Sequence, residues 1–137
     1  MKRLLFLFIT VLFLGVSCEK DLKLSEFVVG NWKSQEITLG DSPFGSFTAL
    51  IKATNKYTLT FTLSDGSASI SCPETGYTID DAKSQIIITE PDFDPNDGVT
   101  PTGTQTFDVT WKEGDKVMTW IPVNGGTDAP TLVLTRQ

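Results

Sequence analysis

The sequence predicts an all-β protein: a single antiparallel, up-and-down β-barrel of about eight strands that follows an N-terminal signal peptide. Three observations support this prediction. An apolar N-terminal run ends at a cysteine, Cys18. The rest of the chain is a succession of short runs rich in Thr, Ile, Val and aromatic residues, separated by Gly, Asn, Asp and Pro. Two predicted hairpins each have one apolar and one polar face.

Residues 1–17 have the composition of a secretory signal peptide. Lys2 and Arg3 precede an apolar run from Leu4 to Leu14, and small residues follow before Cys18. As a helix this run would be about 16 Å long, which is too short to span a bilayer core of about 30 Å comfortably. A buried N-terminal helix is the alternative, but no polar stripe interrupts the run as an amphipathic helix would require.

Cys18 is predicted to hold the membrane anchor. The segment from Leu14 to Cys18 resembles the lipobox of bacterial lipoproteins. This resemblance implies cleavage before Cys18, diacylglycerol on its sulfur and acylation of the new amino terminus, and several acyl chains would anchor the protein stably. Ordinary secretion is the alternative. Glu19 is not the aspartate that resembles an inner-membrane retention signal, so an exported protein on the outer membrane is expected, on either its periplasmic or its cell-surface side.

The mature chain is predicted to form one domain. Residues 18–26 are expected to be a polar tether, and residues 27–137 the barrel. Without residues 1–17 the chain has seventeen acidic and nine basic side chains, a net charge of −8. This charge disfavours nucleic acid and anionic lipid as partners. With Cys18 lipidated, only the thiol of Cys72 remains, so no internal disulfide can form.

Nine segments of the mature chain have the composition of β-strands. They lie near residues 28–38, 47–53, 56–64, 67–73, 76–81, 84–90, 104–112, 116–122 and 130–136. This is one segment more than the eight strands of the predicted barrel. The segments 76–81 or 84–90 are therefore expected to be part of one bent strand, or one of them lies outside the barrel.

The first predicted hairpin turns at Asp65-Gly66, a sequence that suits a two-residue type I′ turn with positive φ at both positions. A one-residue slip of this register would scramble both faces. Cys72 lies on the apolar face, where a small core residue is favoured over a nucleophile or metal ligand. The apolar face pairs Leu63 with Ala68, Phe61 with Ile70, and Leu59 with Cys72, whereas the opposite face pairs hydroxyl side chains.

The second predicted hairpin turns at Gly114-Asp115. Its apolar face pairs Trp111 with Met118 and Val109 with Trp120, and Phe107 continues that face. Both hairpins thus have one dry and one solvated side, as an antiparallel barrel requires. We expect Phe61, Ile70, Trp111 and Trp120 to share one interior.

The two ends of the predicted domain resemble those of the lipocalins, and more closely those of small lipocalin-like lipoproteins of Gram-negative bacteria. Gly30 and Trp32 form a Gly-x-Trp motif in the first strand, and Arg136 ends the last strand. The resemblance implies an eight-stranded barrel in which the Trp caps the closed end and the Arg lies across its indole. The lipocalin Thr-Asp-Tyr motif has no counterpart, because Thr127-Asp128 lacks the tyrosine.

No enzymatic activity and no cofactor are predicted. The chain has no histidine, which excludes Ser-His and Cys-His catalytic groups and histidine zinc sites. It has no glycine-rich phosphate loop. A carboxylate pair for glycoside hydrolysis stays open, although most acids lie in turns or on polar faces, where solvation is the simpler explanation.

One acidic segment, residues 90–98, contains a candidate calcium site. Asp92, Asp94 and Asn96 have the alternate spacing of a calcium loop. Gly98 stands one place late, and no Glu occupies the twelfth position of the loop. A solvated connection between strands is the favoured alternative.

The leading functional prediction is a binding module that takes a small apolar or amphipathic ligand at the open mouth of the barrel. The same side chains could instead simply fill the core, since eight strands enclose little space. The rival prediction is a structural or interaction lipoprotein with a filled barrel, which engages a protein partner through loops such as residues 39–46 with Phe44. The candidate ligand-cavity residues are Phe61, Phe107, Trp111, Met118 and Trp120.

Overall fold

The computed structural model describes residues 22–39, 42–112, 114, 116–124 and 130–137. The predicted signal peptide, Cys18 and Thr127-Asp128 lie outside these residues. Among the described residues, no helix is long and apolar enough to cross a bilayer. The elements are one short helix, α1 (Leu24–Phe27), and the strands β1 (Gly30–Ser34), β2 (Ile37–Leu39), β3 (Ser42–Lys52), β4 (Lys56–Leu63), β5 (Ser69–Ser71), β6 (Thr75–Asp80), β7 (Gln85–Thr89), β8 (Thr104–Trp111), β9 (Val117–Pro122) and β10 (Leu132–Arg136).

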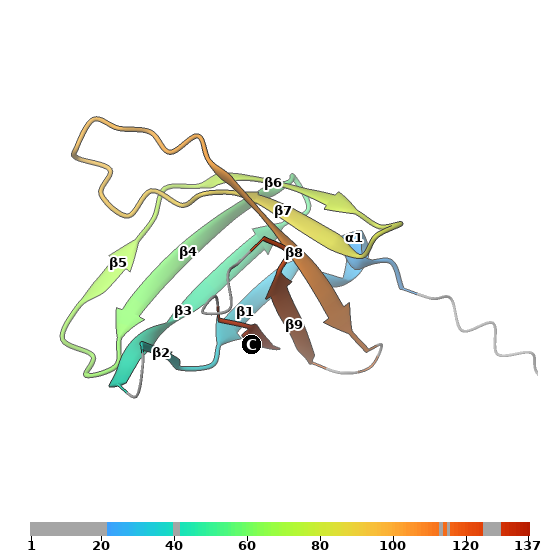
Figure 1. The fold of residues 1–137 in the computed structure, drawn as a ribbon, viewed down its shortest axis with the longest axis horizontal. Coiled ribbons are helices and arrows are strands. Elements are labelled where there is room, and N and C mark those ends of the chain that lie inside the picture. Colours follow the sequence, from blue (N-terminus) through green and yellow to red (C-terminus); the bar gives the residue numbers. More distant parts are fainter. Residues whose placement is uncertain (1–21, 40–41, 113, 115, 125–129) are drawn as a thin grey trace, which may run out of the picture.

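Eight of these strands close into one antiparallel barrel (Figure 1). The ring runs β1, β3, β4, β6, β7, β8, β9, β10 and returns to β1, so each strand pairs with its neighbours along the chain. The first and last ring strands pair with Trp32 opposite Arg136. The predicted all-β, up-and-down barrel is therefore confirmed.

The two remaining strands lengthen the sheet beyond the ring. β2 continues along β3 where β1 ends, and β5 precedes β6 along β4. The predicted segments 67–73 and 76–81 are thus two parts of one interrupted strand, while 84–90 contains the full ring strand β7. The ninth predicted segment therefore arises from the break between β5 and β6.

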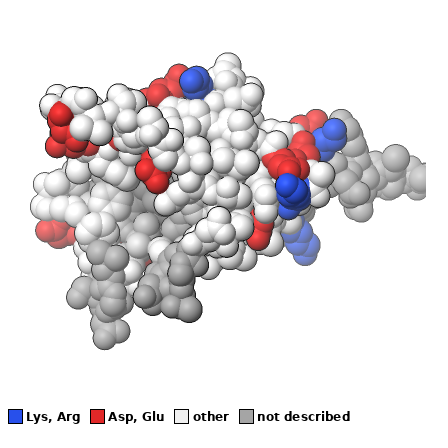
Figure 2. All heavy atoms as spheres, turned by 45° about the horizontal axis from the view of Figure 1, so that its top comes forward, with Lys and Arg blue, Asp and Glu red and all other residues white. Residues whose placement is uncertain are grey.

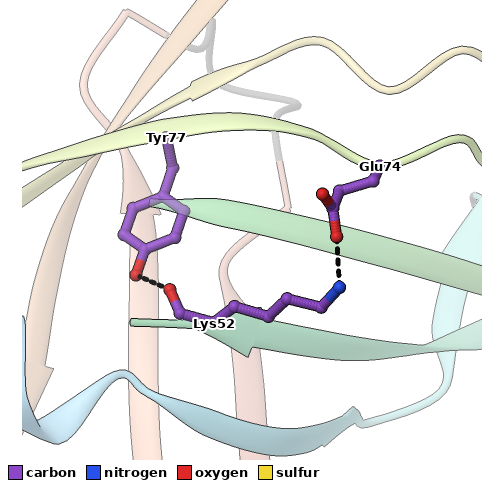
Figure 3. Close-up of polar contacts among 3 residues, drawn as sticks. All are labelled: Lys52, Glu74 and Tyr77. Carbon is purple, nitrogen blue, oxygen red and sulfur yellow. Dashed lines mark hydrogen bonds and ion pairs between the residues drawn. The ribbon is translucent and has the colours of Figure 1, made fainter. Parts of the chain in front are cut away.

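Polar contacts hold this break against β3 (Figure 3). The hydroxyl of Tyr77 donates to the carbonyl of Lys52 at 2.6 Å. The ammonium of Lys52 pairs with the carboxylate of Glu74, which lies between β5 and β6. One lysine therefore connects the end of β3 to the interruption itself and to β6.

The predicted register of the first hairpin is confirmed, but its turn type is wrong. Phe61 pairs with Ile70, as the apolar face requires. Of the two turn residues only Gly66 has a positive φ, of +69°, and its N–H donates to the carbonyl of Leu63 at 2.9 Å. Asp65 instead accepts a hydrogen bond from the Ser67 N–H at 2.8 Å. The register of this hairpin therefore does not depend on a type I′ turn.

The second hairpin has the predicted register, with Trp111 opposite Met118 and Val109 opposite Trp120. Phe107, Val109, Met118 and Trp120 are buried, and Trp111 is half-buried against the same core. Phe61 also packs against this core. Ile70 does not, because it is 43% exposed on β5, beyond the ring. The predicted common interior is therefore correct for three of its four residues.

The two ends of the barrel differ. At one end, here called the closed end, α1 lies beside the turn 81–84, on the right in Figure 1, and its Phe27 carbonyl accepts a hydrogen bond from Arg136 at the end of β10. Leu24 and Phe27 are only 1% and 3% exposed. The Ser25 N–H and hydroxyl both donate to the Asp81 carboxylate, at 2.9 and 2.8 Å, and the N–H bond is the main reason why the pKa of Asp81 is lowered.

The predicted polar tether, residues 18–26, is therefore shorter than expected. Leu24 is buried and Leu22 packs against the core, so the described chain joins the barrel at its first residues. The apolar side chains of this segment are too few and too closely spaced to show a period in the sequence. At the opposite end, here called the open end, lie the turn 64–68, the loop 90–103, the end of β9 and the start of β10 (Figure 1).

Candidate functional site at the open end of the barrel

The residues of the Gly-x-Trp and terminal Arg motif meet at the closed end. The Trp32 side chain is fully buried, and the Arg136 guanidinium lies over its ring with the central carbon 4.4 Å from the ring centroid. The guanidinium also donates to the carbonyls of Val29 and Phe27 at 2.9 and 2.5 Å. Gly30 has a φ of +147°, and a Cβ there would lie 2.7 Å from a guanidinium nitrogen. These residues therefore seal one end, and a ligand site must lie elsewhere.

A cavity of about 400 Å³ occupies the open half of the barrel. Its wall is mostly aliphatic and aromatic, and it reaches the outside where Phe93 is 52% exposed. The lining comes from six of the eight ring strands, from β2 and from the loop 90–103: Ile37, Phe47, Ala49, Ile51, Tyr57, Leu59, Phe61, Ile88, Glu90, Pro91, Phe93, Gln105, Phe107, Trp120 and Leu132.

Three of the five predicted cavity residues, Phe61, Phe107 and Trp120, line this space. The other two lie outside its lining. Trp111 stacks on Phe27 of α1 with ring centroids 6.0 Å apart, and Met118 is fully buried beside the Trp120 indole N–H, 3.2 Å from its sulfur. Alternation along a strand correctly predicts which face points inward, but it does not indicate how deep a residue lies along the barrel axis.

Several lining residues were not predicted, although β3 and β4 offered a signal. Phe47, Ala49 and Ile51 alternate along β3 and face Phe61, Leu59 and Tyr57 across the pairing. Ala49 is 1% exposed, and its small side chain leaves room that a larger residue would fill. The lining residues of the loop 90–103 have no periodicity and could not be predicted in this way.

Two polar side chains of the cavity wall, Tyr57 and Glu90, influence each other electrostatically. The buried hydroxyl of Tyr57 donates to the carbonyl of Thr89, and burial is the main cause that raises the pKa of Tyr57 well above its usual value, with Cys72 and Glu90 adding to it. Glu90 lies against Gly103, where a Cβ would come within 2.5 Å of the Glu90 carboxyl carbon. The absence of a side chain at Gly103 therefore makes room for the Glu90 carboxylate.

An apolar groove of about 390 Å³, here called the rim groove, lies beside the mouth. Phe44 and Phe61 are in contact there with ring centroids 5.2 Å apart. Phe61 and Phe93 line both the groove and the cavity, so the two apolar surfaces are continuous. The groove is lined by Phe44, Phe61, Leu63, Ala68, Ile70 and Phe93.

The candidate calcium ligands do not converge. The Asp92 carboxylate accepts the N–H of Asp94 at 3.0 Å, and the Asp94 carboxylate accepts that of Asn96 at 3.4 Å. Within the part of the chain that the structure describes, no group of three or more acidic, Cys or His side chains could hold a metal ion. The side chains instead stabilise turns of their own loop.

Cys72 is a free thiol that is 5% exposed, in agreement with the interpretation as a small core residue. Burial is the main cause that raises its pKa, and the nearby Asp92 carboxylate contributes. A raised pKa leaves little reactive thiolate at neutral pH.

The open end thus combines an apolar cavity, an adjoining apolar groove and a small number of polar side chains. The sequence matches no model of a known protein family, and no curated protein matches it. The function of the protein is therefore inferred from the geometry of this end.

Proposed function

We propose that the protein is a lipid-anchored, lipocalin-like lipoprotein whose barrel binds a small apolar or amphipathic molecule at its open end. The cavity of about 400 Å³ is the observation on which this proposal depends. Ligand pockets in proteins commonly measure about 300–1,000 Å³ and have apolar walls with a few polar groups. A barrel of eight strands is just wide enough for one small ligand.

Two further observations support the proposed class of protein. The Arg136 guanidinium lies across the Trp32 indole at the closed end, the arrangement that the lipocalin resemblance implies. The segment from Leu14 to Cys18 supplies the lipobox-like sequence on which the anchor depends.

A Leu59→Trp substitution is expected to empty the protein of its ligand. Leu59 lines the cavity, and an indole in its place would occupy volume that a ligand needs. In native mass spectrometry of protein purified from its own membrane, we expect a copurified small molecule with the wild type and at least about tenfold lower occupancy with the variant.

Leu50→Trp is the matched control, because Leu50 lies on the neighbouring strand but is 44% exposed on the outside of the barrel. It should retain the wild-type occupancy, and thermal unfolding checks that both variants fold, since overpacking commonly costs about 1–3 kcal/mol. A wild-type protein that is always bare, or equal occupancy in both variants, would contradict the proposed function.

A second candidate function is an interaction lipoprotein that docks a protein partner in the rim groove. Phe44 and Ile70 line this groove and are 42% and 43% exposed, and exposed apolar patches mark interaction surfaces. Neither residue lines the cavity. A Phe44→Ser, Ile70→Ser double variant should therefore leave small-molecule occupancy unchanged. A photo-crosslinker at residue 70 that captures one protein in intact cells, together with a bare cavity, would favour the second function.

A further inference from the structure

Basic side chains are absent from the open end of the described barrel. Neither the cavity nor the rim groove is lined by Lys or Arg among these residues. The internal segments outside the described residues, 40–41, 113, 115 and 125–129, contain no Lys or Arg either. With the exception of Lys33, which is exposed on β1, the register and the chain order place the described basic residues in or next to the ends of the strands near α1. The described basic residues are Lys23, Lys33, Lys52, Lys56, Lys83, Lys112, Lys116 and Arg136.

Acidic side chains, in contrast, are present at the open end. Asp92, Asp94 and Asp97 lie on the loop 90–103, and Asp65 lies in the turn between β4 and β5. Figure 2 shows acidic atoms on this loop at the left, and basic atoms away from it at the top and the right. Among the described residues, the mouth of the cavity therefore carries acidic side chains and no basic side chain that would compensate their charge.

Glu90 brings this negative charge to the wall of the cavity itself. Its carboxylate is the one acidic group among the described lining residues, beside the apolar wall formed by Pro91 and Phe93. Within the described residues, this carboxylate accepts no hydrogen bond and forms no ion pair. Glu90 is exposed at this wall, and its negative charge attracts a cation and repels another carboxylate that approaches it.

We propose that the ligand of this cavity is a cationic amphiphile, with its apolar body against Phe61, Phe107 and Trp120 and its ammonium group at Glu90. This inference rests on the proposed binding function and adds the chemical class of the ligand. A fatty acid fits the apolar wall equally well, but its carboxylate would meet that of Glu90, and the described lining holds no basic residue to offset the repulsion. Among amphiphiles with the same apolar tail, the charge of the head group therefore determines which one binds more tightly.

The test compares three eight-carbon probes with different head groups: octyltrimethylammonium, octyl glucoside and octanoate. The full-chain protein is held in nanodiscs of zwitterionic lipid, and calorimetry against empty discs corrects for partitioning into lipid. With the wild type, the cation should bind about tenfold more tightly than octanoate, with the neutral probe between them.

Glu90→Gln should reduce this preference to about twofold or less, since it keeps the shape of the side chain and removes its charge. Asp108→Asn is the matched control: it also removes one negative charge, lies on the outer face of β8, and can still accept the hydrogen bond from Gln85. It should keep the wild-type preference. In the wild type, raising the salt concentration to about 0.3 M should reduce the ratio of the affinities for octyltrimethylammonium and octanoate, because salt screens the charge of Glu90.

The outcomes separate this inference from the proposed function. Equal binding of the three probes by the wild type, tighter binding of octanoate, or an unchanged preference in Glu90→Gln would overturn the cationic assignment while leaving a binding barrel. Binding of none of the probes by the wild type would count against the proposed function itself.

Discussion

Replacing Arg136 with alanine is expected to lower the free energy of unfolding by about 3 kcal/mol. The guanidinium lies over the buried Trp32 ring and donates to the carbonyls of Val29 and Phe27. Alanine removes the cation–π contact and leaves both carbonyls without this donor at the closed end. Urea unfolding followed by near-UV circular dichroism measures the loss.

Lys116→Ala is the control for this prediction, because Lys116 lies at the same end of the barrel but is exposed. Its effect should stay within about 0.5 kcal/mol. Arg136→Lys should lose most of the stability that alanine loses, since an ammonium cannot stack on the indole and reach two carbonyls with one planar group. An Arg136→Ala protein within about 0.5 kcal/mol of the wild type would show that the motif does not stabilise the closed end.

A Cys18→Ser substitution is expected to abolish lipidation and to move most of the protein from the membrane to the soluble fraction. Without the sulfur, no diacylglycerol can be attached, and about 0.8 kcal/mol of membrane affinity is lost for each buried methylene of the missing chains. Metabolic labelling with a clickable fatty acid, read on the purified protein, measures lipidation independently of the cell fractionation.

The second cysteine of the chain supplies the matched control. Cys72 is buried and lies far along the sequence from the predicted lipobox, so Cys72→Ser should keep both the label and the membrane location. If Cys18→Ser protein still incorporates fatty acid, the predicted attachment site is wrong. If it loses the label but stays in the membrane fraction, a different anchor is present.

Periodicity of side chains allowed the sheet to be predicted, because register and burial reinforce each other. The pairing of Phe61 with Ile70 and of Val109 with Trp120 was fixed by requiring that apolar residues share a face, since a slip of one residue reverses every side chain. The terminal Gly30, Trp32 and Arg136 could be linked through their family resemblance, and they meet in the structure.

Features that depend on the third dimension could not be predicted in this way. Ile70 shares the inward face of its hairpin but lies on β5, outside the ring, because the strand is interrupted before β6. Trp111 and Phe107 share one face of one strand, yet only Phe107 reaches the cavity, because distance along the barrel axis separates them. Glu90 reaches the cavity wall at the start of a loop without a repeating pattern, and no local sequence signal identifies it as a lining residue.

The position of the N-terminal segment determines how an anchored barrel would face its surroundings. Leu22 packs at the end sealed by α1, and only three residues of chain separate it from Cys18, so that the two residues are at most about 14 Å apart when the chain is extended. A lipid on Cys18 would thus hold the molecule upright, with its entrance directed into the aqueous compartment. The ligand would then enter from the aqueous compartment, and not by lateral diffusion from the lipid leaflet that holds the anchor.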